Sequence, residues 1–168
     1  MSKVEAYEFN NLNPGATVVR SLDPLVIEKP RAPIHIHTYG GETPFFRGLA
    51  EGRLMATRCN TKGCDGNAQG DWLPPRVYCP DCLEKMEWIE IKKPKAKVHT
   101  FIRVAYPGAF NRLDTPCNLI SVEIEGCATI LMSVLKEGEP QIGLAIEPRF
   151  NTAHPTFTIL DLHWVPKK

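Results

Sequence analysis

The chain has 168 residues, with 20 Lys and Arg against 19 Asp and Glu, and its net charge of +1 gives no strong electrostatic footprint for DNA or RNA. Hydrophobic residues make up 43% of the sequence, which is enough to build a core and excludes wholesale disorder. There is no apolar run long enough for a transmembrane helix and no apolar signal region at the start, so we expect a soluble, cytoplasmic protein. The 15 prolines are spread along the chain and favour strands and loops over long helices.

The first 42 residues have the composition of an extended arm. They hold four prolines and short apolar patches at 17–19 and 25–27, without a sustained hydrophobic period. Such an arm either packs on the body of the protein or lies on a partner. His35 and His37 alternate with isoleucines, so both would face one side of a strand, either as solvent-facing histidines or as a second metal site.

Residues 43–92 are expected to hold one short helix followed by a ribbon. Thr43 is a suitable N-cap, and Pro44 occupies the favoured first helical position. Gly52 would end the helix. The apolar stripe of this helix consists of Phe45, Phe46, Leu49 and Ala50. Strands are predicted at 53–58 and 86–91, on either side of a cysteine cluster.

Four of the six cysteines carry the strongest chemical signal in the sequence. They are Cys59, Cys64, Cys79 and Cys82. Two close pairs separated by a loop are typical of a tetrahedral zinc site, because each pair sits on a tight turn and offers two thiolates. Gly63 and Gly66 lie on either side of Cys64, and glycine is favoured in tight turns of this kind. Four cysteines leave no open coordination position, so we expect a structural Zn²⁺.

Three other interpretations of the cluster compete with zinc. Two disulfides would need an oxidising compartment, and the sequence shows no secretory signal. Four ordinary buried cysteines would not be expected to fall at this spacing by chance. A redox Cys-x-x-Cys motif usually opens a helix after a strand, whereas a short polar stretch follows Cys82. Zinc is therefore the favoured interpretation.

From residue 93 onward the sequence predicts an all-β domain. Short apolar or alternating segments occur at 97–105, 118–125, 127–135, 143–150 and 156–164. In the first segment Val98, Ile102 and Val104 would share one face. A tight-turn signal at Gly126 makes the second and third segments a hairpin, and Asp161 is expected at the surface end of the last strand. Five short strands with polar turns predict a small barrel of the OB type.

The predicted fold is therefore mainly β. It comprises an N-terminal arm and a short helix, a four-cysteine zinc ribbon, and a five-stranded OB-fold barrel. The corresponding domain boundaries are 1–42 for the arm, 43–92 for the helix and ribbon, and 93–168 for the OB-fold domain.

Three segments resemble motifs of a known family. Residues 45–54, Phe-Phe-Arg-Gly-Leu-Ala-Glu-Gly-Arg-Leu, resemble its F-W-x-G-L-x-x-G-R-L segment. Residues 73–82, Leu-Pro-Pro-Arg-Val-Tyr-Cys-Pro-Asp-Cys, resemble its F-P-P-R-x-x-C-P-x-C segment, and Trp88 matches the tryptophan that follows. Over residues 43–165 the chain is similar to the zinc-ribbon/OB-fold proteins associated with acyl-CoA enzymes, named domain of unknown function 35. It departs from them in its Cys-x4-Cys first pair, where they usually have Cys-x2-Cys, and in its long arm.

The resemblance implies a partner. Proteins of this family accompany a thiolase-fold subunit in enzymes that act on acyl-CoA substrates, and they support that subunit and help to enclose the CoA ester. The implied function is a non-catalytic zinc-binding subunit of an enzyme that cleaves a β-keto acyl-CoA with free CoA, with the catalytic residues on the partner chain. Benzoylsuccinyl-CoA, from anaerobic toluene degradation, is one candidate substrate. The arm and the helix with Phe45 and Phe46 would be the docking elements.

Two stretches are candidates for contact with CoA or with the partner. Four lysines between ribbon and barrel would attract the phosphates of CoA or an acidic partner surface, and the alternative is a solvated linker with ordinary lysines. They are Lys92, Lys93, Lys95 and Lys97, and of the two interpretations the solvated linker is favoured. A loop at an end where OB barrels bind ligands carries Tyr106, Phe110 and Arg112, and here the alternative is an ordinary loop with one buried Phe.

The other two cysteines, Cys117 and Cys127, give no sign of catalysis. Neither is beside a histidine in the sequence, and the simpler interpretation is a loop residue and a small buried hydrophobe. No Gly-rich phosphate loop is present. The roles of both cysteines stay open.

Two other function classes compete with the accessory subunit. A zinc ribbon joined to an OB barrel is also typical of nucleic-acid-binding modules, which need a basic groove with exposed aromatic residues. Here the charge is balanced, aromatic residues are 8%, and only 92–97 is basic, so nucleic acid is a disfavoured partner. A free-standing small enzyme is the third possibility, and it would need activity without any partner chain.

Overall fold

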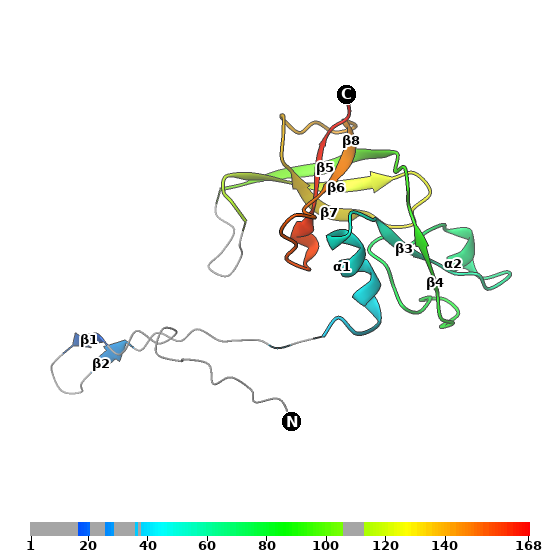
Figure 1. Cartoon of the computed structure of the whole chain (residues 1–168), viewed down its shortest axis with the longest axis horizontal. Helices are drawn as coiled ribbons and strands as arrows, with labels where there is room; N and C mark the ends of the chain where they lie inside the picture. Colours follow the sequence, from blue (N-terminus) through cyan, green and yellow to red (C-terminus); the bar gives the residue numbers. More distant parts are fainter. Residues whose placement is uncertain (1–16, 21–25, 29–35, 37, 106–112) are drawn as a thin grey trace. The chain divides into compact units, whose positions relative to one another are not determined.

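The computed structural model describes residues 17–20, 26–28, 36, 38–105 and 113–168. The chain divides into two compact units, Met1–Thr38 and Tyr39–Lys168. In the first unit β1 (Thr17–Arg20) pairs antiparallel with β2 (Val26–Glu28) (Figure 1). His35 and His37 lie outside the described residues. Within the described ranges, no helix combines the length and the apolar character needed to cross a bilayer.

The second unit begins with a short helix that belongs to its core. The 3-10 turn η2 (Gly40–Glu42) leads into α1 (Thr43–Ala50), and Pro44 lies in the first turn, where its missing N–H costs no hydrogen bond. Thr43 is not the N-cap as predicted, because its hydroxyl donates backwards to the carbonyl of Gly40 at 2.7 Å. Phe45 is only 4% exposed, so the prediction that it docks a partner is wrong.

The ribbon follows α1 and is built on two antiparallel strands. β3 (Met55–Arg58) pairs with β4 (Glu87–Glu90), and the segment between them carries the one-turn helix α2 (Asp65–Ala68). Both predicted ribbon strands are present, each slightly shorter than expected.

Five strands close into a barrel. They are β5 (Ala96–Val104), β6 (Cys117–Ile124), β7 (Leu131–Leu135), β8 (Ala145–Phe150) and β9 (Leu162–Pro166). Their order around the barrel is β5-β6-β7-β9-β8, with β7 and β9 parallel and the other pairs antiparallel. This is the Greek-key order of an OB fold, so the predicted mainly β fold class with a five-stranded OB barrel is confirmed.

Local features shift three of the predicted strands. The register of β5 slips between Val98 and Thr100, and this bulge reverses the alternation, so Ile102 is 63% exposed while Val98 is buried. β7 begins at Leu131 rather than at 127, because the preceding residues bond to the ribbon. β9 begins at Leu162 rather than at 156, because the preceding residues form a loop and the 3-10 turn η3 (Ile159–Asp161).

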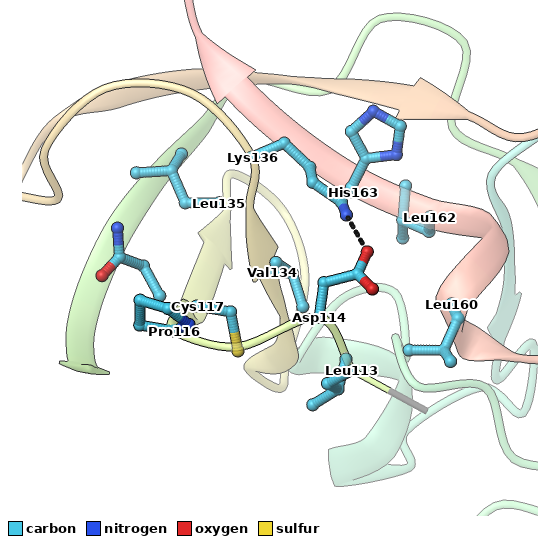
Figure 2. A pocket seen from close by; sticks show the side chains of 11 residues that line it. Leu113, Asp114, Pro116, Cys117, Val134, Leu135, Lys136, Leu160, Leu162 and His163 are labelled. Carbon is cyan, nitrogen blue, oxygen red and sulfur yellow. Dashed lines mark ion pairs between the residues drawn. The ribbon is translucent and has the colours of Figure 1, made fainter. Parts of the chain in front are cut away.

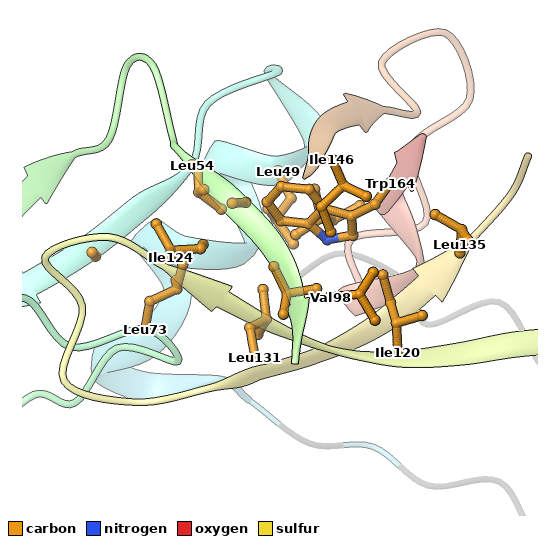
Figure 3. Close-up of a cluster of buried hydrophobic side chains, with 14 of the residues drawn as sticks. Leu49, Leu54, Leu73, Val98, Ile120, Ile124, Leu131, Leu135, Ile146 and Trp164 are labelled. Carbon is orange, nitrogen blue, oxygen red and sulfur yellow. The ribbon is translucent and has the colours of Figure 1, made fainter. Parts of the chain in front are cut away.

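One hydrophobic core joins the helix, the ribbon and the barrel. Trp164 on β9 is fully buried among side chains of other barrel strands, including Val98 and Ile146 (Figure 3). Leu49 of α1 and Leu73 of the ribbon belong to the same cluster and are also fully buried. The helix and the ribbon are therefore packed parts of the same unit as the barrel.

Asp161 organises the loop between β8 and β9. Contrary to the expected surface position, its side chain is fully buried. Its carboxylate accepts hydrogen bonds from the N–H of Thr156 at 2.8 and 3.0 Å, the Thr156 hydroxyl at 2.9 Å and the N–H of Phe157 at 2.7 Å. No ion pair reaches it within the described residues. Hydrogen bonds from backbone N–H groups take the place of water around these buried side-chain oxygens.

Asp161→Asn should lower the free energy of unfolding by about 2–3 kcal/mol, because the new amide N–H₂ would face backbone donors and leave them unpaired. Urea denaturation measures the change. Asp114→Asn is the control, since the Asp114 side chain is 99% exposed, and it should leave the stability unchanged. Equal stability of the two variants would contradict the role given to Asp161.

Candidate metal centre

Four cysteine sulfurs converge in the ribbon. The Sγ atoms of Cys59, Cys64, Cys79 and Cys82 all lie within 4.8 Å of one another. The sulfurs of Cys59 and Cys82 are 3.7 Å apart, and so are those of Cys64 and Cys79. Four sulfurs around a tetrahedral zinc ion, each at about 2.3 Å from the metal, lie about 3.8 Å from one another. Each close pair takes one sulfur from each turn, so the centre depends on both turns.

The first turn accommodates its long Cys-x4-Cys spacing through a glycine. The N–H of Cys64 donates to the carbonyl of Thr61 at 3.2 Å, and Gly63 has a φ of +77°, which glycine adopts without steric cost. Asn67 of α2 reaches back with its side-chain amide and donates to the carbonyl of Cys59. The longer spacing therefore still brings both sulfurs to the same centre.

The second turn is closed by two backbone hydrogen bonds. The N–H of Leu83 donates to the carbonyl of Cys79, and the N–H of Cys79 donates to the carbonyl of Glu84, both at 2.9 Å. The turn requires the residue after Cys82 to adopt the left-handed backbone conformation, and Leu83 does so with a φ of 63°. This bulky side chain is 74% exposed.

The surroundings of the sulfurs are tightly packed. A Cβ atom at Gly66 would lie 2.5 Å from the Cys79 sulfur and 3.6 Å from the Cys64 sulfur, so glycine alone fits. Trp72 and Met86 form a buried cluster with Cys59 and Cys79. The indole N–H of Trp72 donates to the carbonyl of Gly66 at 3.4 Å. The turns and the ribbon core thus support each other.

Backbone bonds attach the ribbon to the barrel. The N–H of Asp71 donates to the carbonyl of Gly126 at 2.9 Å, and the N–H of Ala128 donates to the carbonyl of Asp71 at 2.7 Å. The hydroxyl of Thr129 donates to the carbonyl of Leu73 at 2.7 Å and lies 3.2 Å from the Leu73 N–H. The segment 71–73 therefore couples the cysteine centre to the β6–β7 connection.

The donor set suits a divalent metal that prefers thiolates. A hydrogen bond with the Thr61 hydroxyl, followed by one with the backbone N–H of Glu84, lowers the pKa of Cys82 to about 6. Burial raises the pKa of Cys64, so these two thiols differ in their readiness to ionise. Four such ligands fill a tetrahedral shell and leave no position for a substrate. The predicted ligands are thus brought together in a geometry that fits a structural metal.

Two of the four lysines predicted to contact CoA or the partner form ion pairs within this chain. Lys95 pairs with Glu125 at 3.2 Å and Lys97 pairs with Glu123 at 3.0 Å, both on exposed surface. Lys92 and Lys93 are exposed and have no ion pair within the described residues. The other predicted contact residues, Tyr106, Phe110 and Arg112, lie outside the described residues.

Cys117 and Cys127 lie apart from the centre. Burial, followed by the charge of Asp71, raises the pKa of Cys127 to about 11, so its thiol stays protonated. Cys117 lines a cavity of about 240 Å³ together with Lys136 and His163, as Figure 2 shows. No local sequence pattern indicates this cavity, because its walls come from β6, β7, β9 and η3.

Solved structures of other proteins share the fold. No protein-family model matches the chain. One neighbour is a protein of unknown function from the DUF35 family of Sulfolobus solfataricus, with 21% identity and a TM-score of 0.55 over 77% of this chain and 87% of that chain. Another neighbour is a chain of the Ltp2-ChsH2(DUF35) aldolase, with 21% identity and a TM-score of 0.57 over 80% of this chain and 98% of that chain. The resemblance predicted from the motifs is confirmed at the level of the fold.

Gly66→Ala should reduce the metal content of the purified protein to well below half an ion per chain, because its methyl group would displace the Cys79 sulfur. Cys79→Ser should do the same by removing one ligand. Elemental analysis by mass spectrometry measures the metal, and Cys117→Ser is the control that should keep it. Full metal content in Gly66→Ala would contradict the packing described around the sulfurs.

Proposed function

We propose that this chain is a non-catalytic, zinc-binding accessory subunit of a heteromeric enzyme that processes acyl-CoA substrates. The observation that carries the proposal is the combination of a four-cysteine centre with an OB barrel in one packed unit, which is the fold of DUF35 proteins. One of these neighbours is named together with Ltp2 in an aldolase, which supports a heteromeric role.

The metal in this proposal is a structural Zn²⁺. Cys59, Cys64, Cys79 and Cys82 would hold it, and when bound it would supply a cross-link between the two turns of the ribbon. A closed shell of four thiolates cannot take up a substrate carbonyl, so the ion stabilises the fold and takes no part in the chemistry.

The residues of this chain also support a non-catalytic role. A thiolase needs a nucleophilic thiolate beside a general base. The raised pKa of Cys127 works against nucleophilic attack, and within the described residues neither Cys117 nor Cys127 shares a hydrogen bond with a histidine. We therefore assign the nucleophile to a thiolase-fold partner chain.

The proposed reaction is thiolytic cleavage of a β-keto acyl-CoA by free CoA. In it this subunit would support the thiolase-fold chain and help to enclose the acyl-CoA site. The extended arm together with the ribbon resembles the small zinc-containing subunit of benzoylsuccinyl-CoA thiolase, from anaerobic toluene degradation, which makes benzoylsuccinyl-CoA the first substrate to test. The exposed Lys92 and Lys93 would be the first residues to test for contact with CoA phosphates.

The competing function is a nucleic-acid-binding module. The ion pairs of Lys95 and Lys97 with glutamates weaken the basic cluster that such a module would use. Salt-sensitive binding of single-stranded oligonucleotides would favour this alternative.

Affinity purification of the tagged chain from its native host should recover a thiolase-fold chain, identified by mass spectrometry, and one zinc per bait. The purified complex should cleave a β-keto acyl-CoA in the presence of CoA, whereas the isolated chain should not, because it lacks the nucleophile. A lone monomer that binds oligonucleotides, or an isolated chain that catalyses the cleavage, would contradict the proposal.

A further inference from the structure

Two cavities in the described part of the barrel differ in their lining. One, of about 370 Å³, is lined mostly by charged residues, and its Lys95 and Lys97 pair with glutamates of the same wall. The other, of about 240 Å³, has walls of leucine, valine and proline side chains and few polar groups. Ligand-binding cavities are mostly apolar and carry a small number of convergent polar groups. The cavity of about 240 Å³ therefore has the composition of a ligand site.

Apolar side chains from β7, β9 and η3 form the walls of this cavity, as Figure 2 shows. Val134 of β7 and Leu162 of β9 are buried, and Leu160 of η3 is 39% exposed. Sites for drug-sized ligands have volumes of about 300–1,000 Å³. At about 240 Å³ this cavity suits a smaller molecule with an apolar body.

Lys136 brings to this cavity a positive charge that the chain pairs only loosely. Its backbone N–H donates to the carbonyl of Trp164 at 3.0 Å, which fixes residue 136 beside β9. Its ammonium nitrogen lies 3.9 Å from a carboxylate oxygen of Asp114, which is beyond hydrogen-bond distance, and the Asp114 side chain is 99% exposed. Within the described residues no hydrogen bond engages this ammonium group, so its N–H donors are available to a ligand.

His163 adds a second hydrogen-bonding group to the same cavity (Figure 2). Burial lowers the pKa of His163, and the charges of Lys136 and Arg149 lower it further, while the charge of Glu137 acts in the opposite direction. The ring is therefore neutral near pH 7 and offers one N–H donor and one acceptor nitrogen. In the part of the chain that the structure describes, no hydrogen bond engages this ring.

We propose that this cavity binds a small carboxylic acid with an apolar body, whose carboxylate accepts hydrogen bonds from the Lys136 ammonium group and from the N–H of the His163 ring. The apolar body contacts Val134, Leu160 and Leu162. The inference goes beyond the proposed function and does not depend on it, because every residue of the site belongs to this chain.

Other classes of ligand fit the lining less well. A cation would meet the positive charge of Lys136, and the carboxylate of Asp114 is fully exposed to water. An inorganic anion such as phosphate would leave the apolar walls without a contact. A neutral apolar molecule would leave the Lys136 ammonium group and the His163 N–H without an acceptor.

Titration of the isotope-labelled, full-length chain with hexanoate, followed by NMR, tests the site. We expect saturable shifts of the amide signals of Val134, Lys136, Leu160 and His163, and no shift at Lys95. Hexanamide has the same apolar body without the charge, and it should bind about tenfold more weakly, because it loses a charge-assisted hydrogen bond. Inorganic phosphate should cause no saturable shift at these residues.

Lys136→Gln tests the charge directly. The Lys136 side chain is 51% exposed, so the substitution should keep the fold. We expect this variant to bind hexanoate about tenfold more weakly than wild type and to lose the preference for hexanoate over hexanamide, whereas Lys136→Arg should keep that preference. Lys95→Gln is the matched control, because Lys95 is an exposed lysine at the other cavity, and it should bind both compounds as wild type does.

Each outcome decides for or against the site. A lack of saturable shifts at the cavity residues would overturn it, and so would wild-type affinities for hexanoate and hexanamide within twofold of each other, a comparison that needs no variant. Equal losses of affinity in Lys136→Gln and Lys95→Gln would assign the effect to the net charge of the chain and overturn the site as well. None of these results bears on the proposed function, and failure to recover a thiolase-fold chain would leave this site standing.

Discussion

The convergence of four cysteine sulfurs from two separate turns is the constraint on which the ribbon depends. Each turn is shaped by its own residues, Gly63 in the first and Leu83 in the second, and each close sulfur pair joins one turn to the other. Without a metal, four thiols at this spacing make only weak sulfur–sulfur contacts, which stabilise the ribbon less than metal–thiolate bonds would. The geometry of the centre fits a cross-link between the two turns. The cysteines pack against Trp72, and Trp72 lies in the segment 71–73 that is hydrogen-bonded to the barrel.

The helix, the ribbon and the barrel then act as one structural unit. Leu49, Leu73 and Trp164 come from these three parts and share one buried cluster. A unit of this kind is a packed scaffold, and within the described residues neither Cys117 nor Cys127 shares a hydrogen bond with a histidine. The loop held by the hydrogen bonds of Asp161 is part of the surface of this unit.

Much of this organisation is predictable from the sequence because it rests on local patterns. The spacing of the cysteines predicts two turns directly, and alternating apolar residues predict the barrel strands. The predictions that were wrong concern features set by contacts between distant segments, which local sequence patterns do not indicate. β7 starts late because Ala128 and Thr129 form hydrogen bonds with Asp71 and Leu73 of the ribbon, and a bulge at His99 turns the Ile102 side chain to the other face of β5.

The loop between β8 and β9 and the cavity beside it have no signal in the local sequence. A positive φ is usually signalled by glycine, and at Phe157 that signal is absent. Asp161 lies in a segment that alternates like a strand, so nothing local shows that its carboxylate turns inward to cap backbone N–H groups. The cavity beside the loop is assembled from strands far apart in the chain, which only the closed barrel brings together.

X-ray absorption at the zinc edge of the purified full-length protein tests the central claim most directly. A tetrahedral centre made by Cys59, Cys64, Cys79 and Cys82 predicts a single shell of four sulfur atoms at about 2.3 Å from the metal. A shell with nitrogen or oxygen at about 2.0 Å, or fewer than four sulfurs, would contradict it.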